Sequence, residues 1–168
     1  MATTYTLINS VTVGSGGQSS IDFTSIPATY TDLLIKISGK ANRAIAVDGF
    51  LIAFNGSTSS FSNIYLEGSG SAAYSGSYAR FVGDVVGNTA TANTFGNGEI
   101  YIPNYAGSNN KSFLGDTATE NNATEAYLAM TANLWSNTSA ITSIALTPLA
   151  GTLFNQYSTA YLYGISNA

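Results

Sequence analysis

The sequence predicts an all-β protein, an antiparallel two-sheet sandwich of about ten short strands with no substantial helix. Apolar runs are short, alternate with polar residues and stop at Gly, Asn or Ser clusters, at the spacing typical of a sandwich or barrel. Long segments between strands favour a jelly roll over a meander, and no repeat of fixed period indicates a propeller or solenoid. We expect all 168 residues to form a single domain, 1–168.

The first strand is expected at residues 5–13, with Tyr5, Leu7, Val11 and Val13 on one face. The glycine-rich segment 14–17 then turns the chain into a short strand that carries Ile21 and Phe23. We predict that these two strands form a hairpin.

Further strands are expected at residues 33–37, 47–54, 61–66, 78–86, 99–103, 113–117, 141–146 and 157–165. The segment 47–54 is almost entirely apolar, which predicts a central strand buried on both faces. Asn55-Gly56 is the clearest turn signal, because both residues tolerate positive φ, and the strand at 61–66 should return from it. Residues 67–77 are small and polar, and we interpret them as a long surface loop rather than an interdomain linker.

One run, residues 125–135, fits a helix or a strand. Its Ala and Met residues favour helix, and four of its apolar positions partly match a helical period. As a strand, it places on one face Tyr127, Ala129, Thr131 and Asn133, and on the other Leu128, Met130, Ala132 and Leu134. The second set is a clean apolar alternation, so we predict a strand.

Composition excludes many functions. The chain has no Cys and no His, which removes disulfides, thiol nucleophiles, the Ser-His-Asp triad and most zinc sites. Five basic residues and a net charge of −4 predict no nucleic-acid partner. There is no apolar run near 18 residues, which argues against a membrane span, and the start MATTYTLINS lacks the features of a Sec signal peptide.

Catalysis is also disfavoured. The nine acidic residues are spread singly along the chain, with no pair arranged for glycoside hydrolysis, and no glycine-rich phosphate loop is present. No calcium-loop spacing occurs, although the acidic stretch 116–125 leaves a weak calcium site as an alternative. We therefore expect a protein without enzymatic activity, metal or cofactor.

The polar surface is supplied mainly by uncharged side chains, since Ser, Thr and Asn make up about a third of the chain and charged residues 8%. Such a surface suits a protein that packs against copies of itself or against a lattice. Among the aromatic residues, Tyr74, Tyr105 and Trp135 are the candidates for a protein interface or a glycan-stacking platform. Core packing is the alternative for each, and it is weaker for Tyr74 and Tyr105 because both lie in predicted loops.

Four stretches resemble a group of small virion-associated proteins of tailed bacteriophages, especially aquatic ones. They are TYTLINSVTVGSGGQSSIDFTSIPATYTDLLIKIS, FNGSTSSFSNIYLEGSG, TANTFGNGEIYIPNYAGSNNKSF and the ending ITSIALTP…QYSTAYLYGI, and together they span nearly the whole chain. The resemblance implies a β-sandwich structural component of the virion, assembled in the host cytoplasm, and it carries over no catalytic residues.

Two functions follow from this resemblance. A capsid decoration (cement) protein would stabilise the particle surface, with the major capsid protein or other virion proteins as partners. A head- or tail-fibre module would instead bind a host cell-surface glycan. We favour decoration, because the first strand begins at residue 5 and leaves no room before it for a shaft. Decorations and fibres commonly meet local threefold symmetry, so the resemblance also implies a homotrimer.

Overall fold

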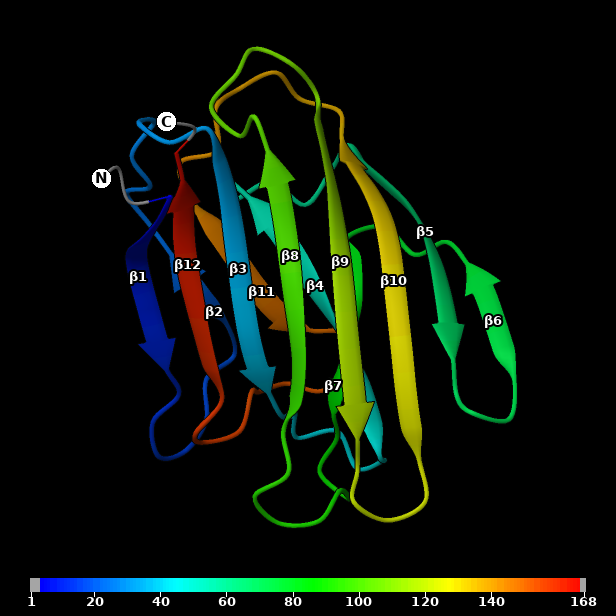
Figure 1. Ribbon diagram of the computed structural model, residues 1–168. Helices are drawn as coiled ribbons and strands as arrows, with labels where there is room; N and C mark the ends of the chain where they lie inside the picture. The colour runs from blue at the N-terminus through cyan, green and yellow to red at the C-terminus, as the bar shows by residue number, and fades with distance from the viewer. Residues whose placement is uncertain (1–3, 167–168) are drawn as a thin grey trace.

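The computed structural model describes residues 4–166, which form twelve strands and no helix. The strands make two antiparallel sheets packed face to face (Figure 1), so the predicted all-β sandwich is confirmed. The large sheet has the order β1 (Tyr5–Thr12), β12 (Thr159–Ile165), β3 (Asp32–Gly39), β8 (Gly96–Pro103), β9 (Lys111–Glu120), β10 (Ala126–Trp135), β5 (Phe61–Gly68) and β6 (Ala73–Gly76). The small sheet has the order β2 (Ile21–Phe23), β11 (Ile144–Pro148), β4 (Val47–Phe54) and β7 (Phe81–Val86).

Eight of these strands have the nested pairing of a jelly roll. β1 pairs with β12, β3 with β8, β2 with β11 and β4 with β7, as if one long hairpin had been folded over onto itself. We call these eight strands the jelly-roll part. The other four are inserted between β4 and β7 (β5, β6) and between β8 and β11 (β9, β10). They widen the large sheet beyond β8, and we call them the extension (Figure 1).

The hydrophobic core lies between the two sheets of the jelly-roll part. Alternate residues of β3 point inward from the large sheet, and alternate residues of β4 point inward from the small one. These fully buried side chains are Leu33, Ile35, Ile37, Phe50, Ile52 and Phe54. Because β4 lies between β11 and β7, nearly all of its residues are buried, as its apolar sequence predicts.

The predicted hairpin between the first two strands is wrong. β1 pairs with β12 in the large sheet, whereas β2 pairs with β11 in the small sheet. The glycine turn forms, with Gly16 and Gly17 at φ 91° and 77°, but it carries the chain across from one sheet to the other. The crossing buries Ile21 and Phe23 of β2, which pair with apolar residues of β11.

The register of β1 also differs from a simple alternation. A bulge between Leu7 and Asn9 shifts the pairing with β12 by one residue. As a result Tyr5 and Leu7 are exposed, while Val11 packs on the core and does not share their face.

The Asn55-Gly56 turn has positive φ at both residues, 52° and 72°, as predicted. Its flanking strands β4 and β5 nevertheless lie in different sheets. The Asn55 side chain explains the difference: its Oδ1 accepts hydrogen bonds from the backbone N–H groups of Thr142 and Ser143, at 2.8 and 3.1 Å. The turn is thereby fixed to the segment before β11 rather than to a hairpin partner.

The loop predicted at 67–77 contains the short strand β6, whose Tyr74 and Ser75 pair with Glu67 and Leu66 of β5. This strand forms the outer edge of the extension (Figure 1). The ambiguous run near the C-terminal third is strand β10, as predicted. Within residues 4–166, no helix is long and apolar enough to cross a membrane.

Candidate functional site

The outer surface of the extension carries a cluster of exposed apolar side chains. In the register of β5, β10 and β9, Met130 lies opposite Leu66, and Ala132 lies between Ile64 and Leu114. We define the apolar face as the five side chains that are 47% to 68% exposed here: Ile64, Leu66, Leu114, Leu128 and Met130. They expose on the order of 500 Å² of apolar surface, which is comparable to the largest patch of a typical monomer and is often functional.

The inner surface of the extension is polar at the corresponding positions. Thr117, Thr131 and Asn133 are buried there. The Thr131 Oγ1 accepts a hydrogen bond from the N–H of Gly115 at 3.0 Å, and the Asn133 side-chain amide donates to the same oxygen at 2.7 Å. The normal orientation of a half-buried strand, apolar inward and polar outward, is therefore reversed in this region.

The close approach of β7 to β9 explains this reversal. A Cβ atom on Gly115 would lie 2.2 Å from the Val82 carbonyl oxygen, and a Cβ on Gly83 would lie 2.2 Å from Thr117 Cγ2. The N–H of Asp84 donates to Thr117 Oγ1 at 3.0 Å, which holds β7 against the extension. Beside Val82 and Gly83 this narrow space admits only glycine and small side chains, and the five side chains of the apolar face lie on the opposite surface. Larger rings, Phe61 and Trp135, point inward only at the end of the extension, where they pack against Phe54 of β4.

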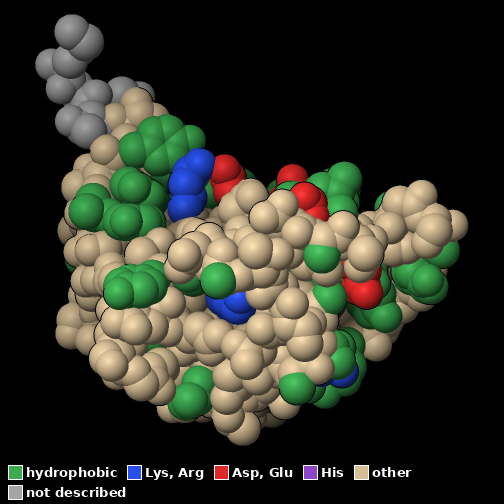
Figure 2. All heavy atoms as spheres, turned by 90° about the horizontal axis from the view of Figure 1, so that it is seen from below, with side chains coloured by type: hydrophobic (Ala, Val, Ile, Leu, Met, Phe, Trp, Pro, Cys, Tyr) green, Lys and Arg blue, Asp and Glu red, His purple; other side chains and the backbone are tan. Residues whose placement is uncertain are grey.

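Charged residues border the apolar face on the side of the jelly-roll part. Lys36 of β3 forms an ion pair with Glu99 of β8 at 2.6 Å, and Glu99 lies opposite Asp116 of β9 in the register. Asp116 in turn lies opposite Met130. An apolar centre beside a charged rim is the usual composition of a protein interface. Viewed from below, the molecule shows few charged side chains, and most of the visible surface consists of backbone and of side chains that are neither charged nor apolar (Figure 2).

The three aromatic candidates from the sequence separate in the structure. Tyr74 is 51% exposed on β6, but it lies on the side of Glu67, opposite to the apolar face. Tyr105 is fully buried, and its hydroxyl donates to the Pro27 carbonyl. The prediction for Tyr105 is therefore wrong, because a side chain enclosed in the core reaches neither a neighbouring protein nor a glycan.

Trp135 is also a core residue rather than a contact residue. It is 1% exposed and packs against Phe54 and Phe61, with ring centroids 5.4 and 6.0 Å away. These rings close the end of the core where β10 meets β4 and β5. The alternative of core packing thus holds for Trp135.

Two acidic residues that are distant in the sequence come together in the structure. Glu67 of β5 and Asp84 of β7 line one cleft, although 17 positions separate them in the sequence. Burial raises the pKa of Asp84 to about 7, with a further contribution from the negative charges of Glu67 and Asp48. Among residues 4–166, no group of three or more acidic side chains is arranged to hold a metal ion.

Comparison of the chain with protein-family models, with curated proteins and with solved structures finds no match. Function is therefore inferred from the side chains and their surroundings. The apolar face is the feature that the sequence did not reveal, since alternation in β10 marks two faces without marking which is exposed. The available signal was indirect: β9 carries Gly115, Thr117 and Thr119, and β7 carries Gly83, where the two strands approach closely.

Proposed function

We propose that this chain is a non-enzymatic structural protein of a tailed-phage virion, a decoration protein that attaches to the outside of the particle through its apolar face. The observation that carries the proposal is the reversed orientation of the extension, which exposes Leu66, Leu128 and Met130 and buries threonine and asparagine. In water, this arrangement leaves apolar surface unburied, and burial against a partner stabilises it by about 25 cal/mol per Å².

The proposed partner is a protein of the shell. A stable protein interface buries about 800 Å² on each side, and the apolar face with the charged residues beside it would form the centre and part of the rim of such an interface. The chain as a whole is poor in charge, with 8% charged residues, which suits close packing in a lattice with little like-charge repulsion. The resemblance to phage virion proteins supports the same assignment.

We further propose that the protein acts as a homotrimer, a number that rests on the resemblance alone. Tyr74 remains available for contacts between copies, whereas Tyr105 does not. Light scattering measures the mass of the oligomer directly, both for the isolated protein and for the protein released from particles. A protein that is monomeric in both states contradicts the trimer.

The decoration role is tested by electron cryomicroscopy, which compares virions that contain this protein with particles that lack it. We expect jelly-roll density on the outside of the head, seated on the apolar face, and its loss from the particles without the protein. Density on a fibre would instead support the alternative adhesion module. Absence of the protein from purified virions would overturn both roles.

A further inference from the structure

A cleft opens between the extension and the edge of the small sheet, on the side opposite to the apolar face. Its volume is about 290 Å³, and its polar lining consists of Arg43, Tyr65, Glu67, Tyr78, Asp84 and Tyr127. β5 contributes Tyr65 and Glu67, β10 contributes Tyr127, and β7 contributes Asp84. Three phenol rings and two carboxyl groups thus share a space the size of one small organic group.

Asp84 is the least satisfied polar side chain of this cleft. It is only 6% exposed, and its Oδ2 has no hydrogen-bond partner among the described residues. Burial raises the pKa of Glu67 as well as that of Asp84, and the negative charge of Glu67 raises the pKa of Asp84 further. Burial therefore makes ionisation of both carboxyl groups unfavourable, and a positively charged ligand close to them would favour their ionised forms.

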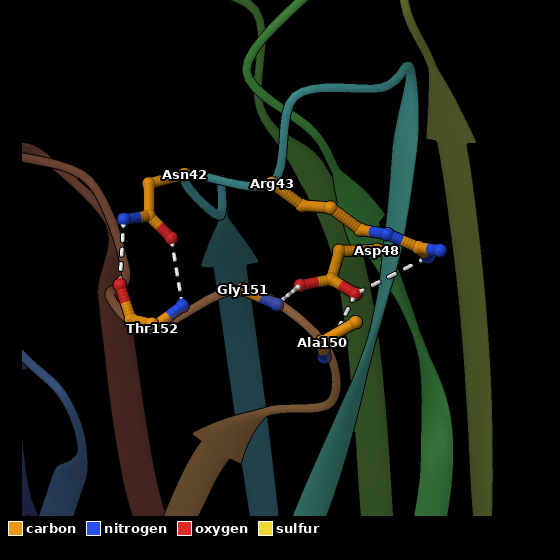
Figure 3. Close-up of polar contacts among 6 residues, drawn as sticks. All are labelled: Asn42, Arg43, Asp48, Ala150, Gly151 and Thr152. Atoms are coloured by element: carbon orange, nitrogen blue, oxygen red, sulfur yellow. Dashed lines mark hydrogen bonds and ion pairs between the residues drawn. The ribbon is translucent and has the colours of Figure 1, made fainter.

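Arg43 does not supply that positive charge, although it lines the same cleft. Its Nη1 lies 3.6 Å from Oδ1 of Asp48, which is fully buried (Figure 3). Asp48 also accepts hydrogen bonds from the backbone N–H groups of Ala150 and Gly151, at 3.2 and 2.8 Å. Asp48 is thus well partnered, whereas the ion pairs found among residues 4–166 leave Glu67 and Asp84 without a cation.

We propose that this cleft binds the primary ammonium group of a small organic molecule, held between the carboxyl groups of Glu67 and Asp84 and flanked by Tyr65, Tyr78 and Tyr127. An ammonium group offers three hydrogen-bond donors, and hydrogen bonds from a charged donor to a carboxylate are the strong ones. Aromatic rings attract organic cations through their negative faces. This binding site is independent of the proposed attachment to the particle and lies on the other face of the large sheet.

The test is a titration of the ¹⁵N-labelled full chain with n-butylammonium, followed by the amide shifts in NMR spectra. We expect saturable shifts at residues that line the cleft and none with butan-1-ol, the neutral molecule of similar size. Equal shifts with butan-1-ol would show an apolar cleft without charge recognition and would overturn the proposal, as would the absence of saturable shifts with the amine.

Two variants assign the binding to the carboxyl pair. Asp84→Asn keeps the shape of the side chain and should weaken binding about tenfold or more, and Glu67→Gln should act in the same direction. Asp116→Asn removes the same charge from the opposite face of the sheet and should leave the affinity unchanged. Unaltered affinity in both cleft variants, or equal weakening in the control, contradicts the assignment.

The pH dependence provides a test on the unmodified protein. A proton on Asp84 competes with the cation, so affinity should rise between about pH 6 and about pH 8. The other charged groups around Asp84 are Glu67, Asp48 and Arg43, and of these only the carboxyl groups raise its pKa. Affinity that is constant over this interval contradicts a role for Asp84.

Discussion

The jelly-roll part and the extension orient the apolar side chains of their strands in opposite ways. In the jelly-roll part, β3 turns Leu33, Ile35 and Ile37 into the core. In the extension, β10 turns Leu128 and Met130 toward solvent and Thr131 toward the interior. The first arrangement buries apolar side chains within the fold, whereas the second leaves them exposed to solvent.

The difference has a structural cause in the spacing of the layers. The two sheets of the jelly-roll part leave room for large apolar side chains, and Phe50, Ile52 and Phe54 fill it. Beneath the extension, β7 approaches β9 so closely that Gly83 and Gly115 are required. The apolar side chains of the extension therefore lie outside the core of the jelly-roll part, on the opposite surface of the large sheet.

The largest expected effect compares one apolar residue from each region. Phe50→Ala removes a fully buried ring of the core and should lower the free energy of unfolding by about 3–5 kcal/mol. Met130→Ala should change it by no more than about 0.5 kcal/mol in the isolated protein, because its side chain is already exposed. Urea unfolding followed by tryptophan fluorescence measures both. Similar losses for the two variants would show that the apolar face is already buried in solution.

The next effect concerns Asp84, the buried carboxyl group beneath the extension. Its ordinary pKa is 3.8, and the folded protein raises it to about 7. Between these values the folded state binds more protons than the unfolded state, so stability should fall as the pH rises from about 4 to about 7 and then level off. The loss should be on the order of 2–4 kcal/mol.

Asp84→Asn should flatten this slope, whereas Asp116→Asn on the exposed face of β9 should not. Unfolding midpoints in urea, measured across the same pH interval, give the comparison. Identical slopes for the parent protein and Asp84→Asn would refute the unfavourable ionisation of Asp84.

A smaller effect tests the narrow space between β7 and β9. Gly115→Ala places a Cβ 2.2 Å from the Val82 carbonyl oxygen and 2.8 Å from Thr131 Oγ1, and it should cost about 1–3 kcal/mol. Gly68→Ala, in strand β5 with no atom within 4 Å of the new Cβ, should stay within about 0.5 kcal/mol of the parent. Thermal unfolding of both variants would separate a true steric limit from a general preference for glycine in this chain.

Sequence patterns predicted the strands well because alternation and turn chemistry are local. The run 47–54 is almost wholly apolar and becomes the buried strand β4, and Asn55-Gly56 takes the expected positive φ values. Partner choice is not local, and there the predictions were wrong. β1 and β2 were expected to pair with each other, but burial of Ile21 and Phe23 against β11 decides the outcome.

The candidate site was hidden for the same reason. Leu128 and Met130 alternate with Thr131 and Asn133, and the packing of β7 against the inner surface of the extension determines which set is enclosed. Tyr105 follows β8 in a segment that resembles an exposed loop, yet its ring fills the core. Glu67 and Asp84 come together because β5 and β7 lie on opposite walls of one cleft, which no sequence spacing indicates.

The most direct test of the account measures attachment to particles that lack this protein. The parent protein and Leu7→Glu, which places a charge on exposed β1 at the other edge of the large sheet, should both bind such particles. Met130→Glu places the same charge within the apolar face and should weaken binding at least about tenfold, since a buried unpaired charge is costly. Circular dichroism confirms that each variant is folded. Binding by Met130→Glu that equals the parent would contradict the claim that the apolar face is the attachment surface.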